Sequence, residues 1–512
     1  MAPDVYRVEV LTNERIDQAE GQRLRHVHPP GWRNPQAAPK YDLVVLGGGT
    51  AGLVGAMGAA GLGARVALVE RHLLGGDCLN TGCVPSKALI RSARAVGELR
   101  KASSLGVETS QVRVDFPAVM QRLRARRAEI APRDAAARLR DAGVDVFFGD
   151  GRFVDATTIA VGEAQLRFRR ALIATGGRPA VPPIPGLDTV PYVTNETLFD
   201  ISELPRRLLV IGAGPIGCEM AQAFARLGST VTVLDRATQV LPREDPMAAF
   251  VLRRHLERDG LRLELGVSVE SAEVHDGEVR LHITKNISRR PEHTILAGDA
   301  LLVGAGRAAN IEGFGLEAAG IRVTAQGIDV SDRLQTSNRR VYASGDVCSA
   351  YKFTHAADAM SRIVLQNALF FGRRKASALV IPWATYTDPE VAHVGTTQVD
   401  VAESGGRLET ITVGLSEIDR AVVDDESDGF VRVHHERGRL RGCTIVASHA
   451  GEMIAEAVYA LTHRGTLGDL SGTVHAYPTQ SEALRKAGDV YRRQALTTAV
   501  RRWLTRYFEW TR

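Results

Sequence analysis

The sequence contains the same pattern of strand, glycine loop, helix and strand twice. In the first copy, the apolar run YDLVVLGGG leads into the small-residue segment TAGLVGAMGAAGLG and then into RVALVE. In the second copy, RRLLVIGAG is followed by PIGCEMAQAFARLG and STVTVLD. Short apolar runs on either side of a helix are typical of a buried, parallel β-α-β unit. The repeat therefore predicts an α/β protein with two related nucleotide-binding domains.

Each copy carries the glycine spacing GxGxxG between its first strand and its helix. The first glycine permits a tight turn, the second lets the backbone approach a pyrophosphate, and the third packs the helix against the strand. An acidic residue closes the second strand of each copy, 23 positions after the first glycine. The residues are Gly47, Gly49, Gly52 and Glu70 in the first copy, and Gly212, Gly214, Gly217 and Asp235 in the second. Two bound dinucleotides are expected, with hydride passing from one cofactor to the other.

The acidic residue of the second copy also bears on the choice of coenzyme. A carboxylate at Asp235 accepts a hydrogen bond from a free 2'-hydroxyl and repels a 2'-phosphate, which favours NADH over NADPH. The neighbouring Arg236 leaves NADPH as the alternative, because a guanidinium can bind a phosphate.

Length and composition indicate a multidomain enzyme. The 512 residues suggest three or four units, and 44% hydrophobic with 24% charged residues is ordinary for a globular protein. A net charge of +5, with both signs interspersed, gives no reason to expect a nucleic-acid partner. The uncharged stretch 43–64 has the length of a membrane helix, but its regularly spaced glycines favour a buried strand followed by a packed helix. Five cysteines and no recognisable secretory signal predict a reducing, cytoplasmic location.

A cysteine pair, Cys78 and Cys83, lies between the two copies in the segment GGDCLNTGCVPSKALIRSA. A helix is expected to begin at Cys83, and a helix N-terminus stabilises negative charge, so the pKa of this thiol should be lowered. Cys78, one loop earlier, is free to attack a disulfide or to hold a soft metal ion. The alternatives are two buried small residues or half of a zinc site. No second pair of ligands lies nearby at zinc spacing, so no resident metal is expected.

The segment GGDCLNTGCVPSK closely resembles the redox-active segment of the pyridine nucleotide-disulfide oxidoreductases, which include glutathione reductase, dihydrolipoamide dehydrogenase and mercuric reductase. The resemblance covers residues 41 to about 490. It includes both glycine loops, ALIATGGRP at 171–179, LLVGAGRAANIEGFGLEAAGI at 301–321 and TSNRRVYASGDV at 336–347. It implies an FAD-dependent NAD(P)H oxidoreductase that works as a homodimer.

The resemblance also implies an architecture of two Rossmann-like domains and a C-terminal α+β dimerisation domain. The predicted segments are an N-terminal extension (1–40), the first part of the FAD-binding domain (41–185), the NAD(P)-binding domain (186–305), the second part of the FAD-binding domain (306–378), the dimerisation domain (379–490) and a C-terminal amphipathic helix (491–512).

Residue roles are also implied by the same resemblance. Cys83 would face the flavin as a charge-transfer thiolate, and Cys78 would be the interchange thiol that meets the acceptor. Lys87 would lie at the flavin in an ion pair with Glu219. Asp346 would bind the ribityl chain, with Gly345 permitting the close approach. Further cofactor contacts are expected at Gly76, Thr81, Thr175, Gly176 and Gly306. The remaining cysteines, Cys218, Cys348 and Cys443, match no redox role, and buried packing is expected for them.

The segment HAYPTQSEALRKAG departs from the disulfide reductases of the family. They carry His-Pro-Thr-x-x-Glu, in which the histidine protonates the leaving thiol and the glutamate orients it. Here Tyr477 stands in the histidine position, while Glu482 is retained. A phenol with a pKa near 10 is a poor proton shuttle at neutral pH. His475, two residues earlier, is either a substitute base or a plain loop histidine.

Tyrosine at this position is similar to mercuric reductase, whose substrate is a soft metal ion. That enzyme's tail ends in a cysteine pair, whereas this sequence ends FEWTR, and no amino-terminal CxxC domain is present. The acceptor is therefore predicted as a soft metal ion such as Hg(II) or a disulfide. The alternatives are a dihydrolipoamide dehydrogenase or glutathione reductase-like enzyme with His475 as base, and a slow flavoprotein that reports redox state to a partner.

The last predicted helix is amphipathic. Leu496, Val500, Trp503, Leu504, Tyr507 and Phe508 fall on one face, with Arg501, Arg502 and Arg506 beside them. Such a helix suits a membrane surface or a partner helix, but packing on the body of the protein or on a second subunit is the favoured interpretation.

Overall fold

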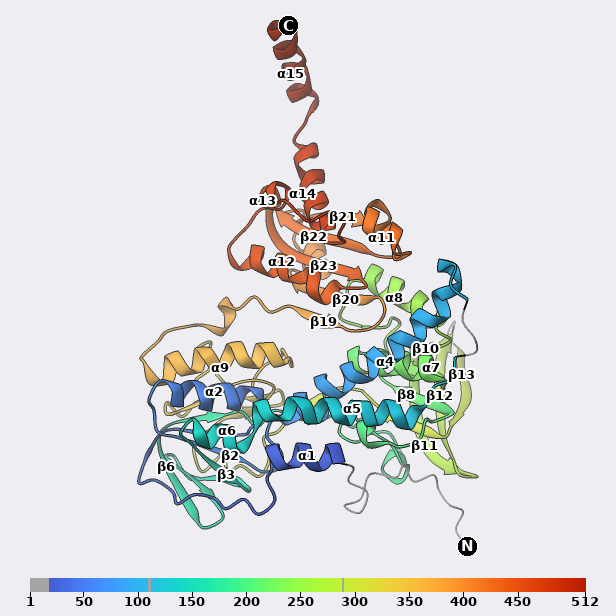
Figure 1. Cartoon of the computed structure of the whole chain (residues 1–512). Coiled ribbons are helices and arrows are strands. Elements are labelled where there is room, and N and C mark those ends of the chain that lie inside the picture. Colours follow the sequence, from blue (N-terminus) through green and yellow to red (C-terminus); the bar gives the residue numbers. More distant parts are fainter. Residues whose placement is uncertain (1–17, 109–111, 288–289) are drawn as a thin grey trace. The chain divides into compact units, whose positions relative to one another are not determined.

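The computed structural model describes residues 18–108, 112–287 and 290–512 (Figure 1). Its contacts divide the chain into two compact units. The first comprises Met1–Arg236 and Gly260–Leu379, and the second comprises Ala237–Asp259 and Val380–Arg512. Among the described residues, no helix is long and apolar enough to cross a membrane. The finer division into six segments remains a prediction.

The first nucleotide-binding copy lies in a seven-stranded sheet of the first unit. Its order is β3-β2-β1-β6-β5-β4, and β18 also pairs with β6. Strands β1, β2, β3, β6 and β18 are parallel, whereas β5 pairs antiparallel with β6 and β4 pairs antiparallel with β5. The strands are β1 (Tyr41–Leu46), β2 (Val66–Glu70), β3 (Val144–Phe148), β4 (Gly151–Asp155), β5 (Thr158–Val161), β6 (Ala164–Ile173) and β18 (Val341–Ala343).

Helix α2 (Thr50–Gly61) packs between this sheet and α9 (Thr354–Leu369), and Figure 1 shows the two helices side by side. A Cβ atom at Gly55 would lie 2.6 Å from Leu172 Cδ2, and one at Gly58 would lie 2.5 Å from Leu365 Cδ1. Larger side chains at these positions would push the layers apart. The uncharged stretch 43–64 is therefore a buried strand followed by a packed helix, as the sequence predicted.

The second copy forms a four-stranded parallel sheet in the order β10-β9-β8-β14, with α7 (Pro215–Leu227) following β8. An antiparallel sheet, β11-β12-β13, and two short pairs, β7 with β15 and β16 with β17, complete the strands of this unit. The bounds are β7 (Gly177–Pro179), β8 (Arg207–Ile211), β9 (Thr230–Asp235), β10 (Arg262–Leu265), β11 (Val267–His275), β12 (Glu278–Ile287), β13 (Arg290–Gly298), β14 (Ala300–Val303), β15 (Arg307–Ala309), β16 (Val323–Thr324) and β17 (Gly327–Ile328).

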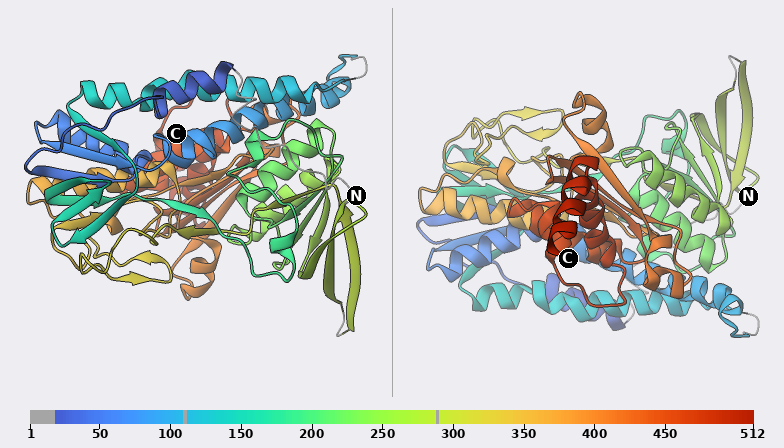
Figure 2. Two further views of the ribbon diagram at one scale, coloured as in Figure 1. Left: turned by 90° about the horizontal axis from the view of Figure 1, so that it is seen from below. Right: turned by 90° about the horizontal axis from the view of Figure 1, so that it is seen from above.

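The remaining helices of the first unit include α4, which begins at Cys83. Helix α4 packs on both α5 and α7, and α1 lies along α5 in Figures 1 and 2. The bounds are α1 (Gln18–Val27), α3 (Gly76–Asn80), α4 (Cys83–Lys101), α5 (Phe116–Ile130) and α6 (Ala136–Asp141).

The second unit is built on a five-stranded antiparallel sheet in the order β19-β20-β23-β22-β21, with a core in which Val431, Cys443 and Leu484 are fully buried. The predicted fold class, two Rossmann-like domains with a C-terminal α+β domain, is confirmed. The elements of this unit are α8 (Pro246–Arg258), β19 (Trp383–Thr385), β20 (Glu390–Gly395), α10 (Gln398–Glu403), β21 (Glu409–Gly414), α11 (Asp419–Val423), β22 (Phe430–Glu436), β23 (Arg439–Ala447), α12 (Ala450–Thr462), α13 (Leu467–Gly472), α14 (Glu482–Gln494) and α15 (Thr498–Thr511).

Candidate active site

The two cysteines lie on either side of a tight turn. Cys78 is in the short helix α3, and Cys83 is the first residue of α4. A Cβ atom at Gly82 would lie 2.8 Å from the Asp77 carbonyl oxygen, so the turn requires a glycine. Both thiols are free. Cys78 is half-buried, and Cys83 reaches the surface although surrounding groups partly desolvate its thiol. The Cys83 Sγ atom lies 3.5 Å from the Thr354 hydroxyl at the start of α9.

The environment separates the acidities of the two thiols. A hydrogen bond from the Cys78 thiol, supported by the Thr354 hydroxyl and the Lys87 ammonium, outweighs burial and lowers the pKa of Cys83 to about 6. The same hydrogen bond, followed by burial, raises the pKa of Cys78. Near neutral pH the reduced pair therefore holds one thiolate, on Cys83, and one proton, on Cys78.

Lys87 connects α4, the helix that begins at Cys83, to α7 of the second nucleotide-binding copy. It lies one turn after Cys83 on α4, and its ammonium donates to the Glu219 carboxylate of α7 at 2.7 Å. The Glu219 side chain is nearly fully buried, whereas the lysine is partly exposed. A buried carboxylate paired with a partly exposed counter-ion fixes the position of that lysine.

The first glycine loop has the shape of a phosphate cradle. Gly47 has a positive φ of 107°, and a Cβ atom there would lie 2.3 Å from the Ala174 carbonyl oxygen. A Cβ atom at Gly52 would lie 1.8 Å from the Gly47 carbonyl oxygen. Gly49 caps α2 in an extended conformation without a side-chain cap, so the helix N-terminus presents backbone N–H groups to this loop.

The Glu70 carboxylate braces the same loop at the end of β2. It accepts from the Gly48 N–H at 2.6 Å and from the His72 N–H at 2.7 Å, and burial raises its pKa. Gly76, at the start of the redox segment, approaches the loop so closely that a Cβ atom there would lie 2.7 Å from the Gly49 Cα atom. The redox segment and the first cradle are thus one continuous site.

The second loop repeats this geometry. Gly212 has a φ of 110°, and a Cβ atom at Gly217 would again lie 1.8 Å from the first glycine's carbonyl oxygen. Gly214 caps α7 as Gly49 caps α2, and a Cβ atom there would meet nothing within 4 Å. The Asp235 carboxylate accepts from the Ala213 N–H at 2.6 Å. The residues of both loops fit a bound dinucleotide.

Asp346, the proposed ribityl ligand, belongs to a charged cluster. The Arg307 Nε atom lies 3.3 Å from the Asp346 carboxylate, and the same guanidinium pairs with Asp77, next to Cys78. Burial raises the pKa of Asp346. Arg307 and Thr354 were not predicted as site residues. Arg307 lies within the family motif LLVGAGRAAN, which could have drawn attention to it. The partners of Arg307, however, are distant from it in the sequence.

The other predicted contacts lie next to strand ends or, for Thr81, at the end of α3. Thr175 donates its hydroxyl to the Asn310 carbonyl at 2.8 Å, and the Thr81 carbonyl accepts from the Asn195 amide at 3.2 Å. Three predicted glycines have positive φ angles that favour glycine: Gly176 (69°), Gly306 (138°) and Gly345 (83°).

Tyr477, His475 and Glu482 lie in the second unit. The Tyr477 side chain is 70% exposed and donates to Asp419 at 2.9 Å, an interaction that raises the pKa of the phenol. His475 is instead paired with the Glu456 carboxylate at 2.9 Å. Glu482, the first residue of α14, is buried. Its carboxylate accepts a hydrogen bond from Arg485, one turn later. The tyrosine and the histidine therefore have different partners.

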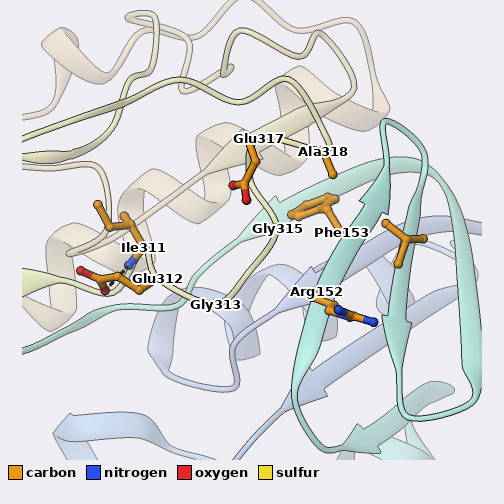
Figure 3. Close-up of a pocket in the computed structure, with 9 residues that line it drawn as sticks. Arg152, Phe153, Ile311, Glu312, Gly313, Gly315, Glu317 and Ala318 are labelled. Carbon is orange, nitrogen blue, oxygen red and sulfur yellow. Dashed lines mark hydrogen bonds between the residues drawn. The ribbon is translucent and has the colours of Figure 1, made fainter.

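A surface hollow of about 690 Å³ lies between β4 and the segment 311–318 of the first unit (Figure 3). Figure 3 shows the Phe153 ring beside Ala318, with Glu312 and Glu317 carried by the segment. Its lining includes neither redox cysteine and no residue of the glycine loops. The chemistry of the chain is concentrated at the cysteine pair instead.

Family models and sequence relatives agree with this arrangement. The model described as pyridine nucleotide-disulphide oxidoreductase matches residues 41–361, and the dimerisation domain of that family matches residues 381–488. A mercuric reductase from Lysinibacillus sphaericus is 34% identical over 451 residues, covering 87% of this chain and 82% of that protein. A dihydrolipoyl dehydrogenase from Bacillus subtilis (strain 168) is 33% identical over 468 residues, covering 88% and 98% respectively.

Solved structures share the fold along nearly the whole chain. The HOCl-induced flavoprotein disulfide reductase RclA from Escherichia coli matches with a TM-score of 0.78 and 29% identity, covering 88% of this chain and 99% of that one. A Cu(II) complex of RclA matches with a TM-score of 0.77 and covers 87% and 98%. LpdA from Mycobacterium tuberculosis matches with a TM-score of 0.79 and 28% identity, covering 89% and 100%.

The predicted membership of a mercuric-reductase-like branch is confirmed by these matches. The duplicated cradles and the cysteine pair lie within the matched residues, and residues 381–488 of the second unit match the dimerisation domain. The chain belongs to class I of the pyridine nucleotide-disulphide oxidoreductases, a family of FAD-dependent oxidoreductases.

Proposed function

We propose that this chain uses NADH and bound FAD to reduce a thiol-reactive acceptor through Cys78 and Cys83, and that the acceptor is a soft metal ion such as Hg(II) or a disulfide. The observation that carries the proposal is the unequal pair of thiols at the start of α4, with a lowered pKa at Cys83 and a raised pKa at Cys78. The relatives named mercuric reductase and dihydrolipoyl dehydrogenase support the class of acceptor.

Bound FAD would accept a hydride from the nicotinamide and deliver two electrons to the Cys78–Cys83 disulfide. The chain's own residues then control the charge and the proton of the reduced pair. Lys87 and the helix N-terminus stabilise the negative charge left on Cys83. Cys78 keeps its proton until an acceptor arrives, since its own pKa is raised. Reducing one disulfide consumes NADH and a proton and yields two thiols, whereas reducing Hg(II) to the metal consumes NADH and releases a proton.

The proposed preference for NADH depends on Asp235. Its carboxylate is held at the second cradle by the Ala213 N–H, so a negative charge stands where a 2'-phosphate would have to bind. Arg236 is exposed and follows directly, which keeps NADPH as the alternative coenzyme.

A soft metal ion is the favoured acceptor because of Tyr477. A leaving thiolate must be protonated in disulfide reduction, and the hydrogen bond to Asp419 makes the phenol a weaker acid than an ordinary tyrosine. A metal ion bound by thiolates needs no such acid. RclA, a relative of similar fold, has been solved as a Cu(II) complex, which also supports a metal acceptor.

A dihydrolipoamide dehydrogenase is the second candidate, and one observation favours it. His475 pairs with the Glu456 carboxylate, an arrangement that fixes the orientation of the imidazole. In this alternative, His475 replaces the family histidine as the base. Lipoamide turnover that is lost in His475→Ala but kept in Tyr477→Phe would favour this candidate over the metal reductase.

The family's dimerisation domain supports a homodimer, in which we propose that Tyr477 and Glu482 of one subunit complete the redox site of the other. We also propose a cytoplasmic location, because the proposed reaction needs a pool of NADH and five cysteines are too few for a disulfide scaffold.

Steady-state turnover of the FAD-loaded enzyme with NADH tests the acceptor. The panel is Hg(II), Cu(II), lipoamide, glutathione disulfide and quinones, each with wild type and Cys78→Ser. Rapid turnover of a metal ion that requires Cys78 supports the proposal. Turnover of lipoamide alone supports the second candidate. Uniformly slow reduction of every acceptor contradicts both and supports a redox sensor that acts through a partner.

A further inference from the structure

The last helix of the chain, α15, has no buried residue. It comprises 14 residues and follows α14 after a short connection (Figure 1). Its largest apolar side chains are strongly exposed: Trp503 is 63% and Trp510 is 83% exposed. Both family models end before α15 begins. The sequence favoured a helix packed on the body or on a second subunit; the first of these is not seen among the described residues.

The apolar residues of α15 form one continuous face. Residues of an α-helix follow one another at ~100° around its axis, so Val500, Trp503 and Tyr507 share a side with Leu504, Phe508 and Trp510. Ring contacts join this face along the helix. Trp503 and Tyr507 stack with ring centroids 5.9 Å apart, and Tyr507 contacts Phe508 edge-on with centroids 5.5 Å apart. The face is thus an aromatic strip that runs along the helix.

Arginines border the strip on both sides. On the helical wheel, Arg501 lies next to Phe508 at one edge, and Arg506 lies next to Trp510 at the other. Arg502, which was expected beside the apolar face, lies opposite the strip, as does Glu509, the only acidic residue of the helix. A surface that accommodates the strip must therefore also accommodate a positive charge along each edge, which favours an occupant with negative charge.

A second copy of α15 does not meet this requirement. Two such helices packed strip to strip would bring their border arginines together, because the single glutamate of each copy lies on the far side. Like charges at this position destabilise a helix pair. Helix partners also prefer branched aliphatic side chains at the contact, whereas four of the residues on this strip are aromatic.

A lipid surface meets both requirements. Tryptophan and tyrosine favour the boundary between headgroups and acyl chains, and arginines beside them extend to anionic headgroups. At about 1.5 Å per residue the helix is far too short to span the ~30 Å of a bilayer core, so it would lie in the plane of the interface. We propose that α15 is an interfacial anchor that holds this enzyme on an anionic membrane surface.

Vesicle sedimentation of the full-length, FAD-loaded protein tests the anchor. Vesicles of phosphatidylcholine alone are compared with vesicles that contain roughly a third phosphatidylglycerol. We expect binding to the anionic vesicles only, weakened on the order of 30-fold in Arg501→Gln/Arg506→Gln and abolished in Trp503→Ser/Trp510→Ser. Phe371→Ser, which alters a ring that is 88% exposed elsewhere in the chain, is the matched control and should bind as wild type does.

Fluorescence identifies the part of the chain that binds. The protein has four tryptophans, and the other two, Trp32 and Trp383, donate hydrogen bonds within the folded units. When Trp32 and Trp383 are both replaced by phenylalanine, the tryptophan fluorescence comes from Trp503 and Trp510 alone. Their emission should shift to shorter wavelength on anionic vesicles. Turnover with a water-soluble acceptor should be the same in Trp503→Ser/Trp510→Ser as in wild type, which excludes unfolding as the cause of lost binding.

Two outcomes would overturn the anchor. One is sedimentation with neither kind of vesicle, or equal sedimentation of wild type and the tryptophan variant. The other is a tryptophan variant that changes the oligomeric mass in the absence of vesicles, which would place α15 on a second copy of the chain instead.

Discussion

The redox cysteines differ in acidity although only four residues separate them in the chain. Cys83 is the first residue of a helix and accepts the hydrogen bond that Cys78 donates. The negative charge of the reduced pair therefore lies on the Cys83 sulfur. We propose that this asymmetry gives the two thiols different tasks. The stabilised thiolate remains in place, and the protonated thiol is available for exchange once its proton is removed.

Removal of Cys78 should raise the pKa of Cys83 from about 6 towards the value of an ordinary thiol, because the hydrogen bond from Cys78 is the largest influence that lowers it. In wild type, the alkylation rate at Cys83 should be high at pH 7 and fall as the pH drops through about 6. In Cys78→Ala the fall should begin at a higher pH. Cys348→Ala, which removes a thiol whose pKa burial raises to about 12, should leave the profile unchanged. An unshifted profile in Cys78→Ala would contradict the asymmetry.

The site residues that could be predicted from the sequence are those whose position depends on neighbouring residues in the chain. Gly47, Gly52 and Cys83 are constrained by the turn or helix start in which they lie, and this constraint appears as spacing. Arg307 and Thr354 could not be predicted in this way. Arg307 contacts Asp77 and Thr354 contacts Cys83, and each pair is more than 200 positions apart in the sequence. Such pairings depend on the tertiary fold.

Among the elements, α1 was least predictable. It belongs to the predicted N-terminal extension (1–40), for which no helix is predicted, and residues 1–17 lie outside the described part of the chain. Buried charges, rather than an apolar stripe, attach it to the first unit. Arg23 pairs with Glu20 and with the Asn80 side chain, between the redox cysteines. A pattern of hydrophobic residues cannot reveal a contact of this kind.

Arg127 of α5 completes this attachment. Its side chain is almost fully buried, and it donates to the Asn80 carbonyl at 2.9 Å and pairs with Asp200 at 3.2 Å. Its guanidinium also lies 3.4 Å from the Glu20 carboxylate. The extension is therefore connected to the loop that carries Cys78 and Cys83 through a network of buried charges.

Breaking this network should destabilise the first unit. Arg23→Ala removes one partner of a buried ion pair and should cost about 3–5 kcal/mol in the free energy of unfolding. Arg25→Ala, an exposed position on the same helix, should change it by less than about 0.5 kcal/mol. Denaturant unfolding of both variants provides the comparison, and equal stabilities would contradict the role assigned to α1.

The proposed preference for NADH depends on one residue at the end of β9. Asp235→Ala removes the negative charge at the second cradle, so discrimination against NADPH should fall on the order of tenfold. The ratio of kcat/KM for NADH and NADPH measures this directly. A preference that stays the same in Asp235→Ala would show that the carboxylate does not select the coenzyme.

For the whole molecule, the central prediction is that each redox site draws on two subunits. Hybrid dimers test it when one chain carries Cys83→Ser and the other Glu482→Ala. If Glu482 acts across the dimer, each hybrid retains one site with both residues intact and should recover about half of the wild-type activity, since one of two equivalent sites works. If Glu482 acts within its own chain, both sites of the hybrid are defective and no activity returns.

The most direct measurement is an anaerobic titration of the FAD-loaded enzyme with NADH, in which absorbance at long wavelength is recorded. We predict that wild type develops a band from charge transfer between the Cys83 thiolate and the flavin. The band should weaken as the pH falls through about 6 and be absent from Cys83→Ser. A wild-type enzyme that shows no such band, together with a Cys83→Ser variant that reduces acceptors as fast as wild type, would contradict a redox role for the cysteine pair.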